Sequence, residues 1–169
     1  IVYEKVYPER QKKKGSYKDK WWQYGRRQEQ LYNAAKGKDR IIFHAFTSKH
    51  VCFSFVPTNY IYAGPNVIFI LSKNSDFAVL QSSFHVSWAW TYCSTMRNAG
   101  ITYAATDAFL TFPFPRNKWN NNDSSNLLNE FGEKYYEFRK NLMIENKYGL
   151  TELYNNQNDS KNKSQDLDA

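Results

Sequence analysis

Short runs of β-branched and aromatic residues fill the chain between residues 40 and 71. They read RIIFHAF, VCFSFV, NYIYA and NVIFIL, and the stretches TSKH, PT and AGP separate them. Within VCFSFV, apolar side chains alternate with Cys52 and Ser54, which is typical of a strand that buries one face. This pattern predicts a mainly antiparallel sheet of short strands over about residues 40–71.

The apolar spacing changes to three and four residues from Asp76 onward. Two apolar stripes then run along the chain, which predicts a helix over residues 76–94 that is buried on two sides. A shorter helix is expected in RRQEQLYNAAKG, where Gly37 stands at the position of a C-terminal cap. The two stripes comprise Phe77, Leu80, Phe84, Trp88 and Tyr92, and Val79, Val86, Trp90 and Cys93.

The stretch STMRNAGITYAATD has little periodicity and many small or polar residues, so it is expected to form an exposed loop. The TFPFP sequence that soon follows contains Pro113 and Pro115, which exclude a helix interior and a central strand. Its phenylalanines would anchor the loop while the prolines stiffen its exit. The fold expected so far is α+β, with a sheet, a buried helix and a protruding loop.

The last apolar pattern lies in residues 116–154, which we expect to form a C-terminal helical segment. Its apolar positions alternate strictly between spacings of three and four, a narrow seam that suits packing against another helix. The polar stretch 155–169 is predicted to be a disordered tail. The seam comprises Leu128, Phe131, Tyr135, Phe138 and Leu142.

The composition suits one globular core. The chain has 169 residues, of which 41% are hydrophobic and 18% aromatic. It has no run of about 18 apolar residues, so no membrane span is expected, and its N-terminus resembles neither a start nor a signal peptide, as if excised from a longer polypeptide. Cys52 and Cys93 are too few for a disulfide framework, which favours a reducing, cytoplasmic setting.

Positive charge is concentrated in the first third of the chain. Residues 1–50 hold thirteen Lys and Arg against five Asp and Glu, a net charge of +8, whereas residues 51–169 hold ten against eleven, a net charge of −1. Basic residues alternate with aromatic ones in ERQKKKGSYKDKWWQYGRR, as expected of a protein that binds the phosphate backbone of nucleic acid. A solvated basic surface that only confers solubility is the alternative.

The sequence lacks the motifs of a self-contained enzyme. It contains no GxGxxG, Walker, HExxH or GxSxG motif and no paired CxxC. The histidines and cysteines fit no standard zinc spacing, so no metal site is expected. Nothing places a second titratable group beside Asp107 or Glu133, so no catalytic residue is assigned.

Six stretches occur in an order that resembles one protein family over about 150 residues. After PER they are KWWQYGRRQEQLYNAA, SKH with FVPTNYIY, FAVLQSSFHVSWAW, YAATDAFLTFPFP and GLTELYN. Together they resemble the target-recognition region of large single-chain adenine-N6 DNA methyltransferases, of the type IIG or IIL restriction-modification and related phage-defence (BREX-like) kind. One departure is Thr102, because relatives usually carry Arg directly before the Tyr of this YxxTDxFxTFPFP motif.

The resemblance implies a prokaryotic DNA specificity domain over residues 1–115 that binds double-stranded DNA. The catalytic motif and the S-adenosylmethionine site would belong to a methyltransferase domain in cis, upstream of residue 1. Arg can pair with guanine and Asn with adenine in the major groove. The base-reading candidates are Arg97, Asn98, Gly100, Thr102 and Asn66; the phosphate-contact candidates are Lys12, Lys13, Lys14, Arg26, Arg27, Ser48 and Lys49; the loop anchors are Tyr103, Thr106, Asp107, Phe109, Phe112, Pro113 and Phe114.

Two other interpretations remain open. The chain could be a specificity subunit that acts in trans with a separate methyltransferase, although such subunits usually carry two recognition domains. It could also be a docking module that binds another protein through the Leu128–Leu142 seam and never binds DNA. A phosphate-binding protein loses affinity steeply as salt rises, which distinguishes the last interpretation from the others.

Overall fold

The computed structural model describes residues 2–23, 28–60, 64–96, 100–115 and 122–158. The chain divides into two compact units, Ile1–Lys36 and Gly37–Ala169. The boundary expected near residue 115 falls inside the second unit, in which residues 122–146 pack against residues 74–81. No helix among the described residues is long and apolar enough to cross a membrane.

The first unit is helical and is held together by aromatic side chains. The rings of Tyr3 and Tyr7 stack at 4.9 Å because the two residues lie one turn apart on the same helix. Trp21 packs edge-on against both rings, at 5.5 Å and 5.0 Å, and the guanidinium of Arg10 lies 5.0 Å from the centre of the Tyr17 ring. Its helices are α1 (Val2–Gln11), α2 (Ser16–Asp19) and α3 (Glu29–Ala35).

The short helix expected before Gly37 is α3, and Gly37 has a φ of 80°, the left-handed conformation that favours glycine after a helix. The two helices before α3 were not expected from the sequence. Helix α1 contains Pro8, a residue that usually interrupts a helix.

The second unit contains two antiparallel sheets of three strands each, so the predicted α+β class is confirmed. The first sheet has the order β3-β1-β4, and the second has the order β2-β6-β5. The NYIYA run does not begin as a strand, since Asn59 and Tyr60 lie in a turn, and residues 61–63 lie outside the described residues. The strands are β1 (Arg40–Ala45), β2 (Thr47–Ser48), β3 (Ser54–Pro57), β4 (Asn66–Phe69), β5 (Ser94–Met96) and β6 (Gly100–Thr102).

The helix expected over residues 76–94 is interrupted in its middle. It forms α4 (Asn74–Gln81) and α5 (Ser83–Tyr92), and Ser82 between them is extended, with a ψ of 150°. The Ser82 hydroxyl accepts a hydrogen bond from the backbone N–H of His85 at 3.3 Å, so it caps the second helix. The expected burial on two sides does not extend to α5, where His85 and Ala89 are buried but Phe84, Trp90 and Tyr92 are exposed.

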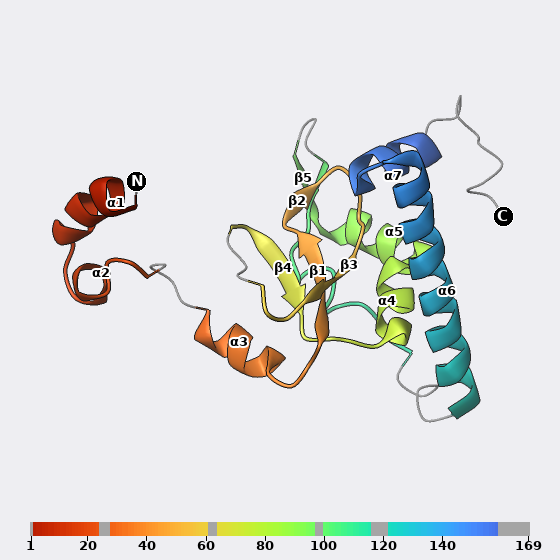
Figure 1. Cartoon of the computed structure of the whole chain (residues 1–169). Helices are drawn as coiled ribbons and strands as arrows, with labels where there is room; N and C mark the ends of the chain where they lie inside the picture. Colours follow the sequence, from red (N-terminus) through yellow and green to blue (C-terminus); the bar gives the residue numbers. More distant parts are fainter. Residues whose placement is uncertain (1, 24–27, 61–63, 97–99, 116–121, 159–169) are drawn as a thin grey trace. The chain divides into compact units, whose positions relative to one another are not determined.

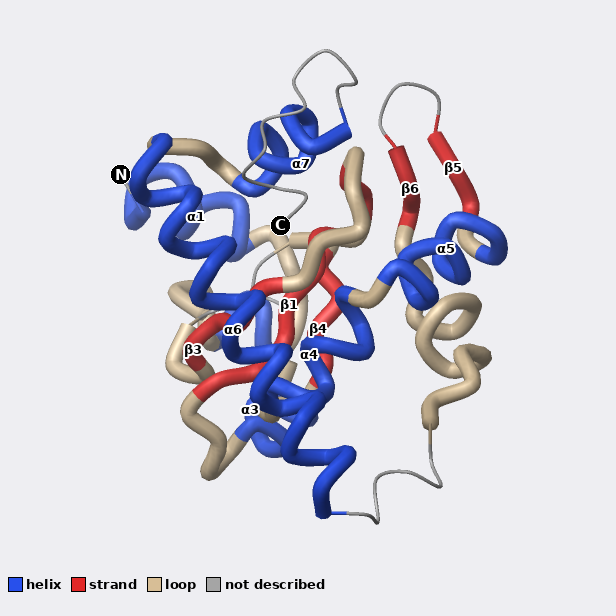
Figure 2. Tube along the Cα trace, turned by 90° about the vertical axis from the view of Figure 1, so that its right-hand side faces the viewer, coloured by secondary structure: helices blue, strands red, loops and turns tan. Residues whose placement is uncertain are grey.

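Helix α6 (Asn122–Asn146) lies along α4, as Figures 1 and 2 show, and α7 (Leu150–Asn158) folds back beside it. A Cβ atom at Gly132 would lie 2.1 Å from the backbone oxygen of Asn74, so the two helices approach closely at this glycine. Helix α7 continues to Asn158, four residues into the segment predicted to be a disordered tail. Residues 159–169 lie outside the described residues.

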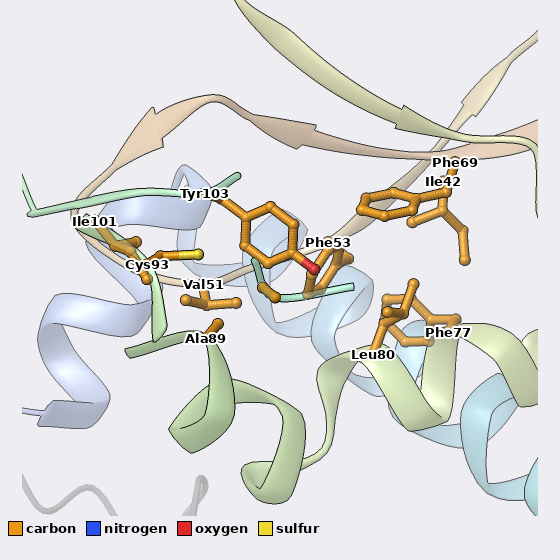
Figure 3. Close-up of a cluster of buried hydrophobic side chains, with 11 residues drawn as sticks. Ile42, Val51, Phe53, Phe69, Phe77, Leu80, Ala89, Cys93, Ile101 and Tyr103 are labelled. Atoms are coloured by element: carbon orange, nitrogen blue, oxygen red, sulfur yellow. The ribbon is translucent and has the colours of Figure 1, made fainter. Parts of the chain in front are cut away.

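The hydrophobic core lies between the sheets and helices α4 and α5 (Figure 3). Its centre is Phe53, which is fully buried and packs against the rings of His44, Phe69, His85 and Tyr103. Because these rings come from the first sheet, from α5 and from the residue that follows β6, aromatic contacts help to attach the second sheet to the scaffold.

Candidate functional site

The stretch interpreted as a recognition loop forms an antiparallel hairpin of β5 and β6. The pairs are Ser94 with Thr102, Thr95 with Ile101 and Met96 with Gly100. All three side chains of β5 are exposed, whereas Ile101 of β6 is fully buried. Figure 2 shows the two strands side by side at one end of the unit. A two-stranded ribbon of this kind has dimensions that the major groove of DNA admits.

At Gly100 the hairpin approaches strand β2 closely. Its φ is 95°, and a Cβ atom there would lie 2.2 Å from the backbone oxygen of Ser48 and 2.5 Å from the Cα of Lys49. Strand β2 pairs with β6 through Thr47 opposite Thr102. Gly100 therefore has a structural reason to be glycine in addition to its place among the base-reading candidates.

The base of the hairpin is fixed by Tyr103, which follows half-buried Thr102. The Tyr103 N–H donates to the carbonyl of Phe46 at 2.7 Å, and its hydroxyl lies 2.8 Å from Nε2 of His85. Burial, with a smaller effect of Cys93, raises the pKa of the Tyr103 hydroxyl, so it stays protonated. The hydroxyl is thus a fixed dipole that can donate to or accept from His85.

His44 and His85 are buried beside this tyrosine, and both are held neutral. Burial lowers the pKa of His44 to about 4, against the hydrogen bond to the Ala45 carbonyl, which favours the charged form. Burial also lowers the pKa of His85 to about 4, and the nearby His44 lowers it further. Both histidines therefore serve as uncharged aromatic packing residues at neutral pH.

The TDAFLTFPFP stretch packs its rings against β4 and α5. Phe109 lies 4.8 Å from Phe69 and 5.1 Å from Phe114, and Phe112 lies edge-on to His85 at 4.6 Å. Pro113 and Pro115 between and after these rings are exposed.

The turn that precedes those rings is closed by hydrogen bonds. The Thr106 hydroxyl donates to the Asp107 carboxylate at 2.8 Å, and the Asp107 N–H donates to the carbonyl of Ala104 at 3.0 Å. Trp88 of α5 donates from Nε1 to the Thr111 hydroxyl at 3.0 Å, and that hydroxyl donates to the carbonyl of Asp107. The polar residues of the motif are therefore used locally to hold the turn.

Of the phosphate candidates near the hairpin, Ser48 and Lys49 already have partners within the protein. The Ser48 hydroxyl donates to the carbonyl of His50 at 2.6 Å. The ammonium group of exposed Lys49 donates to Oδ1 of Asn155 in α7 at 2.6 Å, and His50 Nε2 lies 3.0 Å from the same oxygen. An ammonium group has three donors, so this contact orients Lys49 and leaves capacity for an anion.

The other candidates are distributed over both units. Asn66 is half-buried at the start of β4, opposite Ala45. Lys12, Lys13 and Lys14 are exposed in the first unit, and Lys12 forms an ion pair with Glu9 at 2.6 Å. Four candidates lie outside the described residues: Arg26, Arg27, Arg97 and Asn98.

Arg139 of α6 is a central residue that the sequence interpretation missed. It is only 4% exposed, and its guanidinium donates to the carbonyl of Phe53 at 2.6 Å and to the Tyr154 hydroxyl at 3.2 Å. The Gln81 amide completes the network: its oxygen accepts from the backbone N–H of Phe53 at 2.9 Å, and its nitrogen donates to the carbonyl of Val51 at 3.2 Å. Gly132, Tyr136 and Arg139 recur at spacings of four and three, so they share one face of α6. This spacing was the sequence feature that could have indicated the packed face.

The face of α6 that the sequence marked as apolar lies largely toward solvent. Phe131 is 62% exposed and Phe138 is 45% exposed, whereas Leu128 and Leu142 at the two ends are half-buried. Each residue of the packed face, such as Gly132 and Arg139, comes one position after a residue of the seam. No group of three or more His, Cys, Asp or Glu within the described part of the chain is arranged to hold a metal ion.

Comparison with known proteins adds two findings. The sequence profile of the family described as "MmeI, target recognition domain" matches residues 2–116. A solved structure of the type IIL restriction-modification enzyme MmeI in complex with DNA has a similar fold, with a TM-score of 0.63 and 18% sequence identity. The similarity covers 97% of this chain, which spans 21% of the length of that one. No curated protein matches the chain.

Proposed function

The chain belongs to the MmeI target recognition domain family, and on this premise we propose that it recognises a specific sequence in double-stranded DNA. The enzyme it serves would be a site-specific adenine-N6 DNA methyltransferase that uses S-adenosylmethionine. The methyltransferase part would lie in the same polypeptide, acting on DNA in the prokaryotic cytoplasm. The recognition of DNA is supported by the comparison structure, which is described as a type IIL restriction-modification enzyme in complex with DNA.

The observation that carries the proposal within this chain is the β5–β6 hairpin. It presents exposed side chains on β5, while Ile101 and Tyr103 hold the other strand in the core. A rigid base with an exposed ribbon suits direct readout, because base contacts require side chains to be held at fixed positions in the groove. Thr102, at the base of the hairpin, and the residues around its tip would then determine the site.

The phosphate contacts would be supplied from elsewhere and would carry no sequence information. Lys49 is oriented by Asn155 close to the hairpin, and the exposed Lys12, Lys13 and Lys14 lie in the basic first unit. Cations of this kind neutralise phosphates, which are identical at every step of the duplex. They would set affinity and register, whereas the hairpin would set specificity.

The decisive experiment is sequencing of the methylated sites left by the complete enzyme carrying Thr102→Arg. A threonine hydroxyl can donate or accept, whereas arginine selects guanine, so the variant should methylate an altered and more restricted set of sites. Thr151→Arg adds the same charge on an exposed surface of α7 and is the matched control. Unchanged sites for Thr102→Arg, with only a lower rate, would show that the hairpin is scaffold.

The salt dependence of DNA binding tests whether Lys49 contacts phosphates and does not read bases. Replacing Lys49 by Ala should weaken binding to all duplexes alike and reduce the log–log salt slope by about 0.9. The proposal of DNA binding fails if the wild-type protein shows no salt-dependent affinity for any duplex, which is the result expected of a protein-docking module.

A further inference from the structure

A pocket of about 350 Å³ lies among helices α5, α6 and α7 and the segment after β2. Trp90 of α5, Tyr135 of α6, and Tyr154, Gln157 and Asn158 of α7 contribute to its lining. The volume is near the lower end of the range of about 300 to 1,000 Å³ found for ligand sites, so it suits one small group. Of the described base-reading candidates, none lines this pocket.

The lining combines aromatic rings with amide groups. Trp90 is 41% exposed, and the rings of His50 and Tyr154 lie 5.8 Å apart with an angle of 30° between their planes. The amide of Asn158 lies 3.5 Å from Nδ1 of His50, at the end of α7. Aromatic faces bind nucleobases by stacking, and amides pair with the hydrogen-bonding edges of bases. The chemistry of the pocket therefore suits a planar heterocycle with polar edges.

The surroundings of the pocket carry positive charge. Buried Arg139 donates to the Tyr154 hydroxyl at 3.2 Å, and Nη1 lies 3.4 Å from Oε1 of Gln81, so its charge is directly behind two lining residues. The lining found in the described part of the chain includes no Asp or Glu. Lys49 is held beside His50 because both contact Asn155. A positive potential with no opposing carboxylate favours an anionic ligand.

From these contacts we propose that the pocket binds a nucleoside 5′-phosphate group, with the base against the aromatic lining and the phosphate extending past His50 to Lys49, which lies outside the lining. The group has the same chemistry whether it is a free nucleotide or an unpaired nucleotide of bound DNA. Only the second source rests on the DNA recognition proposed above.

The first test titrates the 169-residue chain with the four deoxynucleoside 5′-monophosphates and the matching nucleosides, followed by calorimetry. At least one monophosphate should bind to a single site. Trp90→Ala should weaken that binding by tenfold or more, whereas Trp90→Phe should retain most of it. Lys49→Ala should weaken the monophosphate and leave the nucleoside unchanged. Tyr92→Ala removes an exposed ring from the same helix outside the lining and should have no effect.

The second test separates the two sources. If the ligand comes from DNA, the wild-type chain should prefer a duplex with one unpaired base over a fully paired duplex, and Trp90→Ala should abolish the preference. If free monophosphate binds but the chain shows no such preference, the ligand of the pocket is a free nucleotide. The proposal is overturned if no monophosphate binds at millimolar concentration and no preference exists, or if Trp90→Ala changes neither. Site selection by Thr102 variants is measured independently, so it stands or fails separately.

Discussion

The two three-stranded sheets of the second unit differ in how their side chains are covered. In β3-β1-β4, Ile41 and Ile42 are fully buried and Phe69 is 5% exposed. In β2-β6-β5, Ile101 is the buried side chain, and all three residues of β5 are exposed. The first sheet is therefore buried or half-buried at every residue except Pro57, whereas the second presents an outer strand to solvent. Substitutions on such a strand should disturb the core little, which suits the proposed role of the hairpin in contacting bases.

Of the changes considered, lowering the pH should reduce the free energy of unfolding most. His44 and His85 both have a pKa of about 4, below the usual 6.5, so the unfolded chain binds protons that the folded one excludes. The free energy of unfolding is therefore highest above pH 6.5. It should fall by roughly 3 kcal/mol for each histidine as the pH is lowered toward 4. Urea unfolding between pH 7 and pH 4 measures the loss.

A His85→Gln variant should show about half of this pH dependence, because one of the two titrating groups is absent. A free energy of unfolding that stays constant between pH 6.5 and 4 in the wild-type chain would contradict the neutral, buried state of both rings.

The hairpin itself divides into a buried and an exposed strand, and paired substitutions should reveal this. Ile101→Ala removes a fully buried side chain and should cost about 2 to 5 kcal/mol. Thr95→Ala, at its partner position across the ladder, should change stability by less than about 0.5 kcal/mol. Chemical denaturation of both variants checks the difference, and equal costs would mean that β5 is part of the core after all.

The contact between α6 and α4 should tolerate no added methyl group. Gly132→Ala places a Cβ 2.1 Å from the Asn74 oxygen, so the helices must separate at a cost of about 1 to 3 kcal/mol. Gly149→Ala is the control, since nothing lies within 4 Å of its added atom. Thermal unfolding of the two variants should differ clearly, and similar melting temperatures would argue against this close approach.

A substitution at Gly100 should affect recognition as well as stability. Gly100→Ala combines a φ of 95° with a clash against β2, whereas Gly64→Ala has a φ of 98° and no neighbouring atom within 4 Å. The difference between the variants isolates the clash, at about 1 kcal/mol or more. In the complete enzyme, Gly100→Ala should impair site-specific methylation much more than Gly64→Ala. Equal activities would show that β2 does not position the hairpin.

The fold class was predictable from the sequence because hydrophobic spacing reports which faces are buried. The break at Ser82 was not, since the apolar positions on its two sides continue one helical pattern while the hydroxyl caps a new helix. The packed face of α6 was missed for a related reason. It is formed by Gly132 and Arg139, which a hydrophobic pattern counts as a helix breaker and a polar residue.

The candidate site was less accessible to sequence reasoning. Strands β5 and β6 have only three residues each, too few to show a clear alternation, and β6 also pairs with β2, about fifty residues earlier in the chain. The bond between Lys49 and Asn155 joins residues 106 positions apart. Local patterns contain no information about such partners, so only the structure shows that α7 lies beside the segment after β2.

Arg139 also has a consequence for the order in which the chain folds. Its acceptor, the carbonyl of Phe53, lies 86 residues earlier, and its other main partner, Tyr154, lies 15 residues later. Desolvating a guanidinium before both partners are in place would be costly. Helix α6 should therefore dock only after the first sheet has assembled and α7 has been synthesised, which makes closure of the core a slow, late event dominated by long-range contacts.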